Sequence, residues 1–188
     1  MTSRLGAVLA LLATLAGAAR ADSGRALDLD QLIDLSEEIV VGEVVDSRAR
    51  WEGKLVVTDT VVRVDETMKG APPREVTITQ PGGTAVHPRL GAEVTTQAST
   101  FTAFVRGESV VLFVDQRAGV RRLVGAQQGK LVVEPPAAQG AQPRGLAVGP
   151  KALRVEPHTG GGTIGTRGMT LDELRARVVA HKQKGGSR

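Results

Sequence analysis

The chain contains no cysteine and no tyrosine, and its aromatic residues are one tryptophan and three phenylalanines. The lack of cysteine excludes disulfide bonds, thiolate metal sites and cysteine nucleophiles, so a hydrophobic core has to supply the stability of the fold. So few aromatic rings argue against a platform on which bases or sugars stack. Beyond the N-terminal region, no segment is apolar enough over about 20 residues to cross a bilayer.

Residues 1–21 have the three parts of a cleavable signal peptide. Arg4 supplies a positive charge, Leu5–Gly17 is an uncharged run, and Ala19-Arg20-Ala21 offers small residues at the positions that a signal peptidase reads. We therefore expect cleavage before Asp22 and export to the periplasm or the extracellular space. A retained anchor is the alternative, although the apolar run is shorter than a membrane span.

The net positive charge is small once the signal peptide is removed. Arg4 and Arg20 leave with it, so the net charge falls from +4 to +2. The remaining excess lies mainly in residues 117–130 and in the C-terminal tail. Electrostatic binders of nucleic acid usually carry a denser basic face, and this distribution argues against nucleic acid as the partner.

Hydrophobic periodicity predicts helices only near the two ends of the domain. Asp28 caps a short helix over residues 28–33, with Gln31 at the capping-box position. Thr170-Leu-Asp-Glu173 is a second capping box, and it opens a helix that frays after His181. The sequence leaves open whether this second helix packs on the rest of the chain.

Between these helices the period is that of β-strands, broken by Gly and Pro turns. Gly42 interrupts the first strand and indicates a bulge or bend. Residues 48–53 are predicted to form a turn, and residues 84–107 an irregular loop. The predicted strands are Ile39–Val45, Leu55–Val64, Glu75–Thr79, Val110–Val114, Arg121–Gly125 and Lys130–Glu134.

These elements predict an all-β domain over residues 22–134, a small OB-like barrel of five to six strands with a short N-terminal helix and a C-terminal helix. Three strands in succession, a long connection and two further strands are the order expected of that barrel. Residues 135–169 are predicted to be a linker or loop rich in Pro and Gly, and residues 170–188 a C-terminal helix with a basic tail.

Several short segments also carry a family resemblance. They are Ser36-Glu-Glu-Ile-Val-Val-Gly42, Trp51, Val64-Asp-Glu-Thr-Met-Lys-Gly70, Gln80-Pro-Gly-Gly83, Gly107-Glu108 before Val110–Val114, and Gln128-Gly129-Lys130. In these the chain resembles exported bacterial β-barrel proteins of unassigned function, whose shape is similar to the netrin-like OB module, the fold of the inhibitory domain of tissue inhibitors of metalloproteinases. Those inhibitors chelate zinc through an N-terminal cysteine. This chain has none, so the resemblance does not imply inhibition by that route.

The motifs that could carry catalysis lack their structural context. Gly160–Gly165 fits the dinucleotide pattern in letters, but no buried strand precedes it and no helix follows. His87, His158 and His181 are scattered and lack the spacing of metal ligands. The chain after residue 21 has no nucleophile-elbow motif. The sequence therefore predicts no catalytic residue, no metal and no cofactor.

The sequence favours a binding module over an enzyme. By analogy with OB-like barrels, the ligand is expected near the second and third strands and their loops. Three hypotheses follow: an exported module that docks a protein or cell-envelope partner, a companion or inhibitor of a secreted protease, and a binder of single-stranded nucleic acid. The candidate binding surface consists of Trp51, Gln80, Gly82, Gly83, His87, Phe101 and Phe104.

Overall fold

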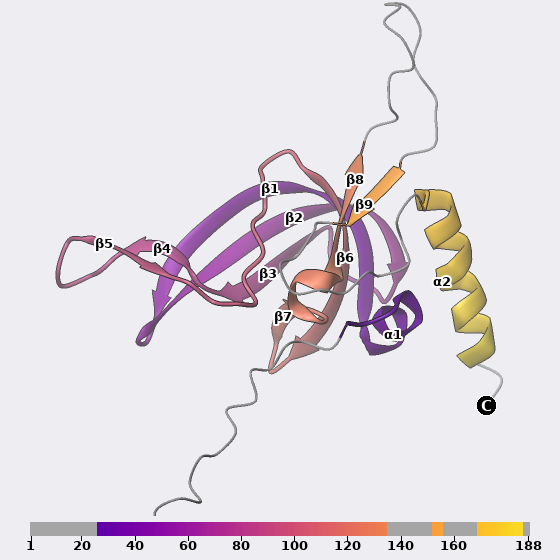
Figure 1. Cartoon of the computed structure of the whole chain (residues 1–188), viewed down its shortest axis with the longest axis horizontal. Coiled ribbons are helices and arrows are strands. Elements are labelled where there is room, and N and C mark those ends of the chain that lie inside the picture. The colour runs from indigo at the N-terminus through magenta and orange to yellow at the C-terminus, as the bar shows by residue number, and fades with distance from the viewer. Residues whose placement is uncertain (1–25, 135–151, 156–168, 186–188) are drawn as a thin grey trace, which may run out of the picture.

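The structure is a computed structural model that describes residues 26–134, 152–155 and 169–185 (Figure 1). The predicted signal peptide, most of the predicted linker, His158 and Gly160–Gly165 lie outside the described residues. The described elements, in chain order, are α1 (Leu29–Leu35), β1 (Glu38–Glu52), β2 (Leu55–Lys69), β3 (Glu75–Pro81), β4 (Gly83–Val86), β5 (Glu93–Thr96), β6 (Ser109–Arg117), β7 (Val120–Leu123), the 3-10 helix η1 (Ala126–Gly129), β8 (Lys130–Glu134), β9 (Ala152–Val155) and α2 (Leu171–Gly185).

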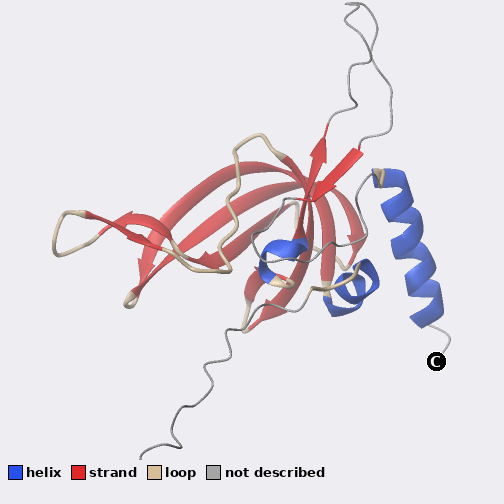
Figure 2. Cartoon of the chain, in the orientation of Figure 1, coloured by secondary structure: helices blue, strands red, loops and turns tan. Residues whose placement is uncertain are grey.

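The described residues are mostly β-structure, with one large sheet and two α-helices. Seven strands form that sheet in the order β1-β2-β3-β7-β6-β8-β9, and β1 pairs with β6 as well as with β2. β3 and β7 pair in parallel through Ile78 and Arg121. β4 and β5 form a separate two-stranded sheet. The hairpin made by β4 and β5 projects at one end of the molecule, and α2 lies at the other (Figures 1 and 2).

β1 and β2 form a long antiparallel hairpin that extends past the rest of the sheet. The predicted turn at residues 48–53 is wrong for residues 48–52, because β1 continues to Glu52 and its register with β2 is unbroken from Ser47 to Glu52. The turn is shorter and lies at residues 53–54. Gly42 does mark a bulge, as predicted, since the register shifts between Val41 and Gly42. A Cβ at Gly42 would lie 2.2 Å from the carbonyl oxygen of Arg63, so only glycine allows the two strands to approach this closely.

The centre of β6 is buried on both faces, as its continuous apolar run predicts. Val111 and Phe113 pack on one face, in a cluster that includes residues of both helices and of β8. Val110, Leu112 and Val114 pack on the other face, against residues of β1, β2 and β3. The sheet therefore separates two hydrophobic clusters.

Both α-helices begin with the predicted capping boxes. Asp28 accepts a hydrogen bond from the backbone N–H of Gln31 at 2.8 Å, and the Gln31 side chain accepts one in return. Thr170 and Glu173 make the equivalent exchange at the start of α2. α2 continues to Gly185, four residues beyond the predicted fraying point. Neither helix is both long and apolar enough to cross a membrane.

α2 packs on the domain, a point that the sequence left open. Its buried residues Leu171, Leu174 and Val178 belong to the same cluster as Leu29, Leu32 and Ile33 of α1. Ion pairs surround this contact: Arg175 with Glu66 of β2 at 2.5 Å, and Arg177 with Asp30 of α1 at 3.0 Å.

Two segments that the sequence predicts to be irregular contain strands. β4 and β5 occupy part of the predicted loop at 84–107 and pair over four residues each. β9 lies inside the predicted linker at 135–169 and pairs with β8. The strand count is therefore higher than the predicted five to six.

Candidate functional site

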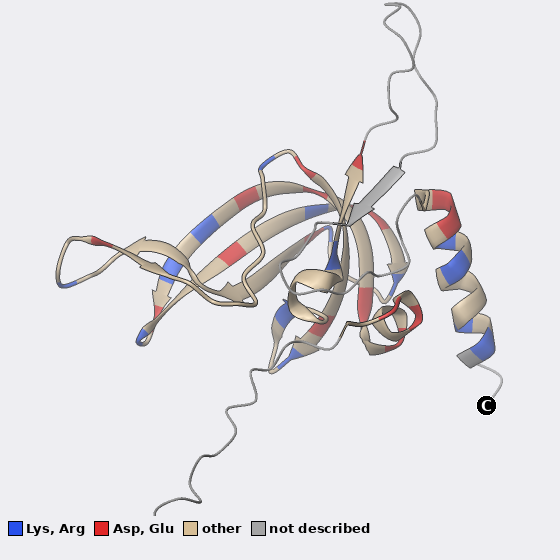
Figure 3. Ribbon diagram, viewed as in Figure 1, with Lys and Arg blue, Asp and Glu red and all other residues tan. Residues whose placement is uncertain are grey.

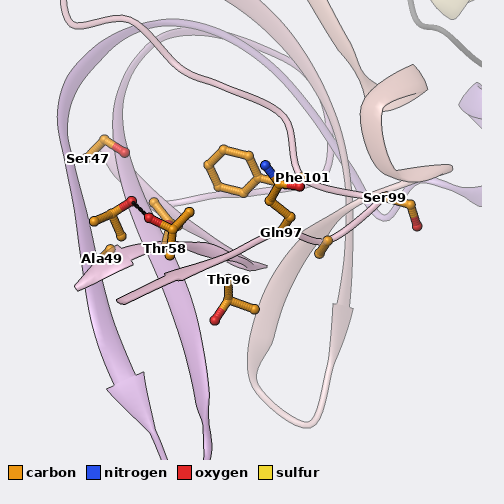
Figure 4. A pocket seen from close by; sticks show the side chains of 11 residues that line it. Ser47, Ala49, Thr58, Thr96, Gln97, Ser99 and Phe101 are labelled. Carbon is orange, nitrogen blue, oxygen red and sulfur yellow. Dashed lines mark hydrogen bonds between the residues drawn. The ribbon is translucent and has the colours of Figure 1, made fainter. Parts of the chain in front are cut away.

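A groove of about 710 Å³ lies between the β1–β2 hairpin and the base of the β4–β5 hairpin (Figure 4). We call it the hydroxyl groove. Its lining comes from β1 and β2, from β4 and β5, and from the segment that follows β5. The lining residues are Ser47, Ala49, Thr58, Gly83, Thr84, Thr95, Thr96, Gln97, Ala98, Ser99 and Phe101.

The lining of the hydroxyl groove is uncharged, and most of its residues have polar side chains. Several of its hydroxyl groups are already engaged: Ser47 with Thr60 at 3.1 Å, Thr58 with the carbonyl oxygen of Gly82 at 2.7 Å, and Thr84 with Thr95 at 2.8 Å. The side chains of Thr96, Gln97 and Ser99 make no hydrogen bond within the described residues. These three side chains are therefore free to donate to a ligand and to accept from it.

Two adjacent glycines place β4 against the inner face of β1 and β2. Gly82 and Gly83 have φ angles of +107° and +118°, which residues with a Cβ rarely adopt. A Cβ at Gly83 would lie 2.3 Å from the Thr58 hydroxyl oxygen. The Gly82 N–H donates to the carbonyl oxygen of Val56 at 2.8 Å. The glycine pair thus allows the start of β4 to lie close to β2, at the floor of the groove.

Two glutamine side chains fix the segment that forms the opposite wall. Gln80 is buried, and its amide exchanges two hydrogen bonds with the backbone of Thr102, at 3.0 and 3.1 Å. The Gln127 amide nitrogen donates to the carbonyl oxygens of Phe101 at 2.9 Å and Ser99 at 3.2 Å. The Phe101 ring is held in the groove by these contacts, and it is the aromatic side chain of the lining.

Trp51 and His87 meet at the β4–β5 hairpin, outside the groove lining. Their rings lie edge to face, with centroids 4.8 Å apart and planes at 80°. The Trp51 indole N–H donates to the carbonyl oxygen of Val86 at 2.9 Å. Val86 and Leu90, in the same hairpin, are exposed. Trp51 and His87 therefore anchor the hairpin to β1.

Phe104 lies apart from the groove. It packs against the cluster of Val110, Leu112 and Val114, and the Lys130 ammonium lies 4.7 Å from its ring centroid. The ammonium also contacts the Glu108 carboxylate at 2.8 Å and the Ala103 carbonyl oxygen at 2.7 Å. Lys130 is 2% exposed, so its contacts with Ala103, Phe104 and Glu108 hold the segment before β6 against the core.

The predicted binding surface thus separates into parts. Gly83 and Phe101 line the groove. Gln80 and Gly82 support it, while Trp51 and His87 hold the hairpin and Phe104 is partly buried against the core. Sequence analysis missed most of the lining, including Ser47, Thr58, Thr96, Gln97 and Ser99. The concentration of Thr and Ser in residues 94–100 was the available signal.

Charged side chains lie on the face of the β1–β2 hairpin that is turned away from the groove. Arg50 donates to Asp59 at 2.6 Å, and Thr79 donates to the other oxygen of this carboxylate at 2.7 Å. Burial raises the pKa of Asp59, but the two hydrogen bonds outweigh it and leave the pKa below its usual value. Figure 3 shows both signs of charge along β1 and β2.

The basic stretch at residues 117–130 does not form a free basic face. Arg121 pairs with Glu38 at 2.7 Å, Arg117 with Asp115 at 2.8 Å, and Lys130 is buried against Glu108. Arg122 is exposed. Most of the positive charge in this stretch is therefore balanced locally.

The described part of the chain holds no cluster of three or more His, Asp or Glu side chains that could bind a metal ion. His87 accepts hydrogen bonds from the backbone N–H groups of Arg89 and Leu90 at 3.2 Å. His181 contacts Asp34 at 2.6 Å on the side of α2 that faces α1. The two histidines thus serve different local contacts.

Comparison with known proteins finds no matching protein family, no matching curated protein and no matching solved structure.

Proposed function

We propose that this protein is an exported, non-catalytic binding module that docks a protein or cell-envelope partner in the hydroxyl groove. The observation that carries the proposal is the combination of a neutral lining with the free side chains of Thr96, Gln97 and Ser99. A binding site needs a few polar groups in fixed positions, and Gln80 and Gln127 supply that rigidity. None of the lining side chains is an acid, a base or an activated nucleophile.

We also infer that the large sheet closes as a small OB-like barrel. The support is the chain of pairings from β1 through β2, β3, β7 and β6 back to β1. β1 is long and bulged at Gly42, so one strand can serve two neighbours. In such a barrel, ligands bind at loops beside the sheet, where the hydroxyl groove lies.

The two alternative functions differ in their support. A companion or inhibitor of a secreted protease rests on the netrin-like resemblance alone. An unchanged rate when metalloproteases are titrated with this protein would count against it. A binder of single-stranded nucleic acid has little support in residues 117–130, because Arg117, Arg121 and Lys130 each face a carboxylate.

A pull-down with matched variants tests the proposed function. The purified protein serves as bait for envelope and culture-medium fractions, and retained proteins are identified by mass spectrometry. Ser99→Arg places a charge in the groove, whereas Thr100→Arg places the same charge on the exposed neighbour that is not part of the lining. We expect one partner to be retained by the wild type and by Thr100→Arg, and to be lost with Ser99→Arg. Equal capture by both variants would contradict docking in the groove.

A further inference from the structure

One wall of the hydroxyl groove is made of five consecutive residues. Thr95, Thr96, Gln97, Ala98 and Ser99 all line it. A wall built from an uninterrupted segment presents its main chain along with its side chains. Because Thr95 and Thr96 belong to β5, this wall begins as a β-strand.

In the part of the chain that the structure describes, the outer edge of β5 carries main-chain groups without a neighbouring strand. Within the described residues, β5 pairs with β4 alone. The His87 N–H donates to the Ala92 carbonyl oxygen at 2.8 Å, so His87 and Ala92 form a hydrogen-bonded pair. This contact sets the phase of the hairpin, that is, which of its cross-strand pairs are hydrogen-bonded. Hydrogen-bonded and non-hydrogen-bonded pairs alternate in an antiparallel ladder. The pair of Thr84 with Thr95 is therefore non-hydrogen-bonded, and the N–H and C=O of Thr95 point away from β4.

A contact on the other strand supports this phase. Val86 pairs with Glu93 and is, by the same alternation, a residue whose main-chain groups point outward from β4. Its carbonyl oxygen accepts the Trp51 indole N–H at 2.9 Å, so it does face away from β5. The outer edge of β4 is thus occupied by a side chain of β1. Of the two edges of this hairpin, the outer edge of β5 is therefore the edge that can receive a further strand.

We propose that the hydroxyl groove binds an extended, uncharged peptide segment of the partner protein, which adds to the outer edge of β5 as a further strand. This inference rests on the proposed function and specifies the chemistry of its ligand. Main-chain hydrogen bonds to a sheet edge give affinity, and the side chains that alternate along the added strand give specificity. An exposed edge of this kind is a ready template for such pairing.

The lining determines which segment fits. A charged side chain would enter a groove that holds no opposite charge, and its burial would be unfavourable. Ala49 and the Phe101 ring offer apolar contact, while Thr96, Gln97 and Ser99 offer hydrogen bonds. Every second residue of an extended segment faces the groove. We therefore expect small or apolar residues to alternate with residues that face solvent.

A selection from a phage-displayed library of random dodecapeptides tests the proposal. The purified wild-type protein is the target, and Ser99→Arg is used to remove peptides that bind elsewhere. We expect the enriched peptides to have an uncharged centre with alternating small or apolar residues. Binding of the synthetic peptides should weaken about tenfold or more with Ser99→Arg and stay within about twofold of wild type with Thr100→Arg. No enrichment, or enrichment of charged centres, would overturn the proposal.

Two further measurements distinguish an added strand from another mode of binding. N-methylation of single peptide amides removes one donor at a time and leaves the protein unchanged. We expect alternate positions to weaken binding, as in a ladder, and the positions between them to have little effect. Thr95→Pro removes the outward N–H of β5 at a position where an edge strand tolerates proline, and we expect it to weaken binding as well. Equal effects at every methylated position would contradict strand addition.

The outcomes separate this inference from the proposed function. If the partner is lost with Ser99→Arg but no peptide binds, the groove docks a partner by other means and the inference fails alone. If neutral oligosaccharides from a glycan panel bind instead and are lost with Ser99→Arg, the ligand class is wrong. If Ser99→Arg changes neither partner capture nor peptide binding, both proposals fail.

Discussion

Replacing Lys130 with methionine should destabilise the protein strongly. The Lys130 ammonium is 2.8 Å from the Glu108 carboxylate and is almost fully buried. At that separation and an effective dielectric constant of about 20, the attraction is about 6 kcal/mol. Desolvation of each ion costs several kcal/mol, so the intact pair contributes little net stability. Removal of one partner is different, because the Glu108 carboxylate then stays mostly buried without its ion-pair partner, and the Val105 N–H at 3.3 Å compensates little of that loss.

The expected cost of Lys130→Met is about 3 kcal/mol in the free energy of unfolding. Breaking a buried ion pair costs about 3–5 kcal/mol. The Glu108 side chain keeps 13% exposure, so some solvation remains and the lower end of that range applies. The Ala103 carbonyl oxygen also loses its donor. Methionine keeps a comparable volume, which limits the contribution of a cavity.

Urea unfolding followed by far-UV circular dichroism measures this cost. With a slope of about 2 kcal/mol per molar urea, the midpoint should fall by about 1.5 M. Glu108→Gln alone should also lower the free energy of unfolding. The double variant should lose at least about 2 kcal/mol less than the sum of the two single losses. A cost below about 1 kcal/mol for Lys130→Met, or additive effects, would refute the reasoning.

Three other predictions concern single residues of the same domain. Gly42→Ala should lower stability by about 1–3 kcal/mol in a thermal melt, because the added Cβ would overlap the Arg63 carbonyl oxygen; an unchanged melting temperature would refute this. Gln80→Ala should cost about 2 kcal/mol and accelerate hydrogen exchange at the Thr102 amide, which loses its acceptor. The pKa of Asp59 is lower in the folded than in the unfolded state, so its stabilisation is present above about pH 4 and is lost as the pH falls through the folded value. Stability of wild type should therefore fall more than that of Asp59→Asn between pH 6 and pH 3, and parallel curves would contradict it.

Local signals predicted the helix starts and one bulge correctly. Each capping box is encoded within four residues, at Asp28 and Gln31 and again at Thr170 and Glu173. Gly42 signalled its bulge because a glycine inside a β-branched run usually marks a bulge or a close approach of two backbones. The apolar run of β6 likewise predicted a strand buried on both faces.

Elements that depend on distant contacts were missed. Residues 48–53 were predicted to be a turn, yet Arg48 and Arg50 alternate with Ala49 and Trp51 and so fit a strand with one polar face. β4 and β5 are four residues each and largely polar, so their sequences carry only a weak strand pattern. They form strands because they pack against the inner face of β1 and β2, which the local sequence does not reveal.

The groove itself could not be predicted from spacing. Ser47 and Ser99 are far apart in the chain, and they line one groove because the β4–β5 hairpin folds back over β1 and β2. Lys130 was counted with the excess positive charge of residues 117–130. It is 2% exposed and paired with Glu108, a partner on another segment that the basic stretch alone does not reveal. Sequence analysis included Gly83 and Phe101 by analogy with the ligand site of OB-like barrels, and it missed the hydroxyl residues that give the groove its character.

Photocrosslinking in the cell tests the central claim most directly. A benzophenone-bearing amino acid in place of Gln97 lies in the wall of the groove, and the same residue in place of Thr77 lies on the exposed outer face of β3. Irradiation should produce one discrete adduct with a partner protein from position 97, none from position 77, and none from position 97 when Ser47→Arg obstructs the groove. Equal adducts from both positions, or an adduct at 97 that persists with Ser47→Arg, would contradict docking in the groove.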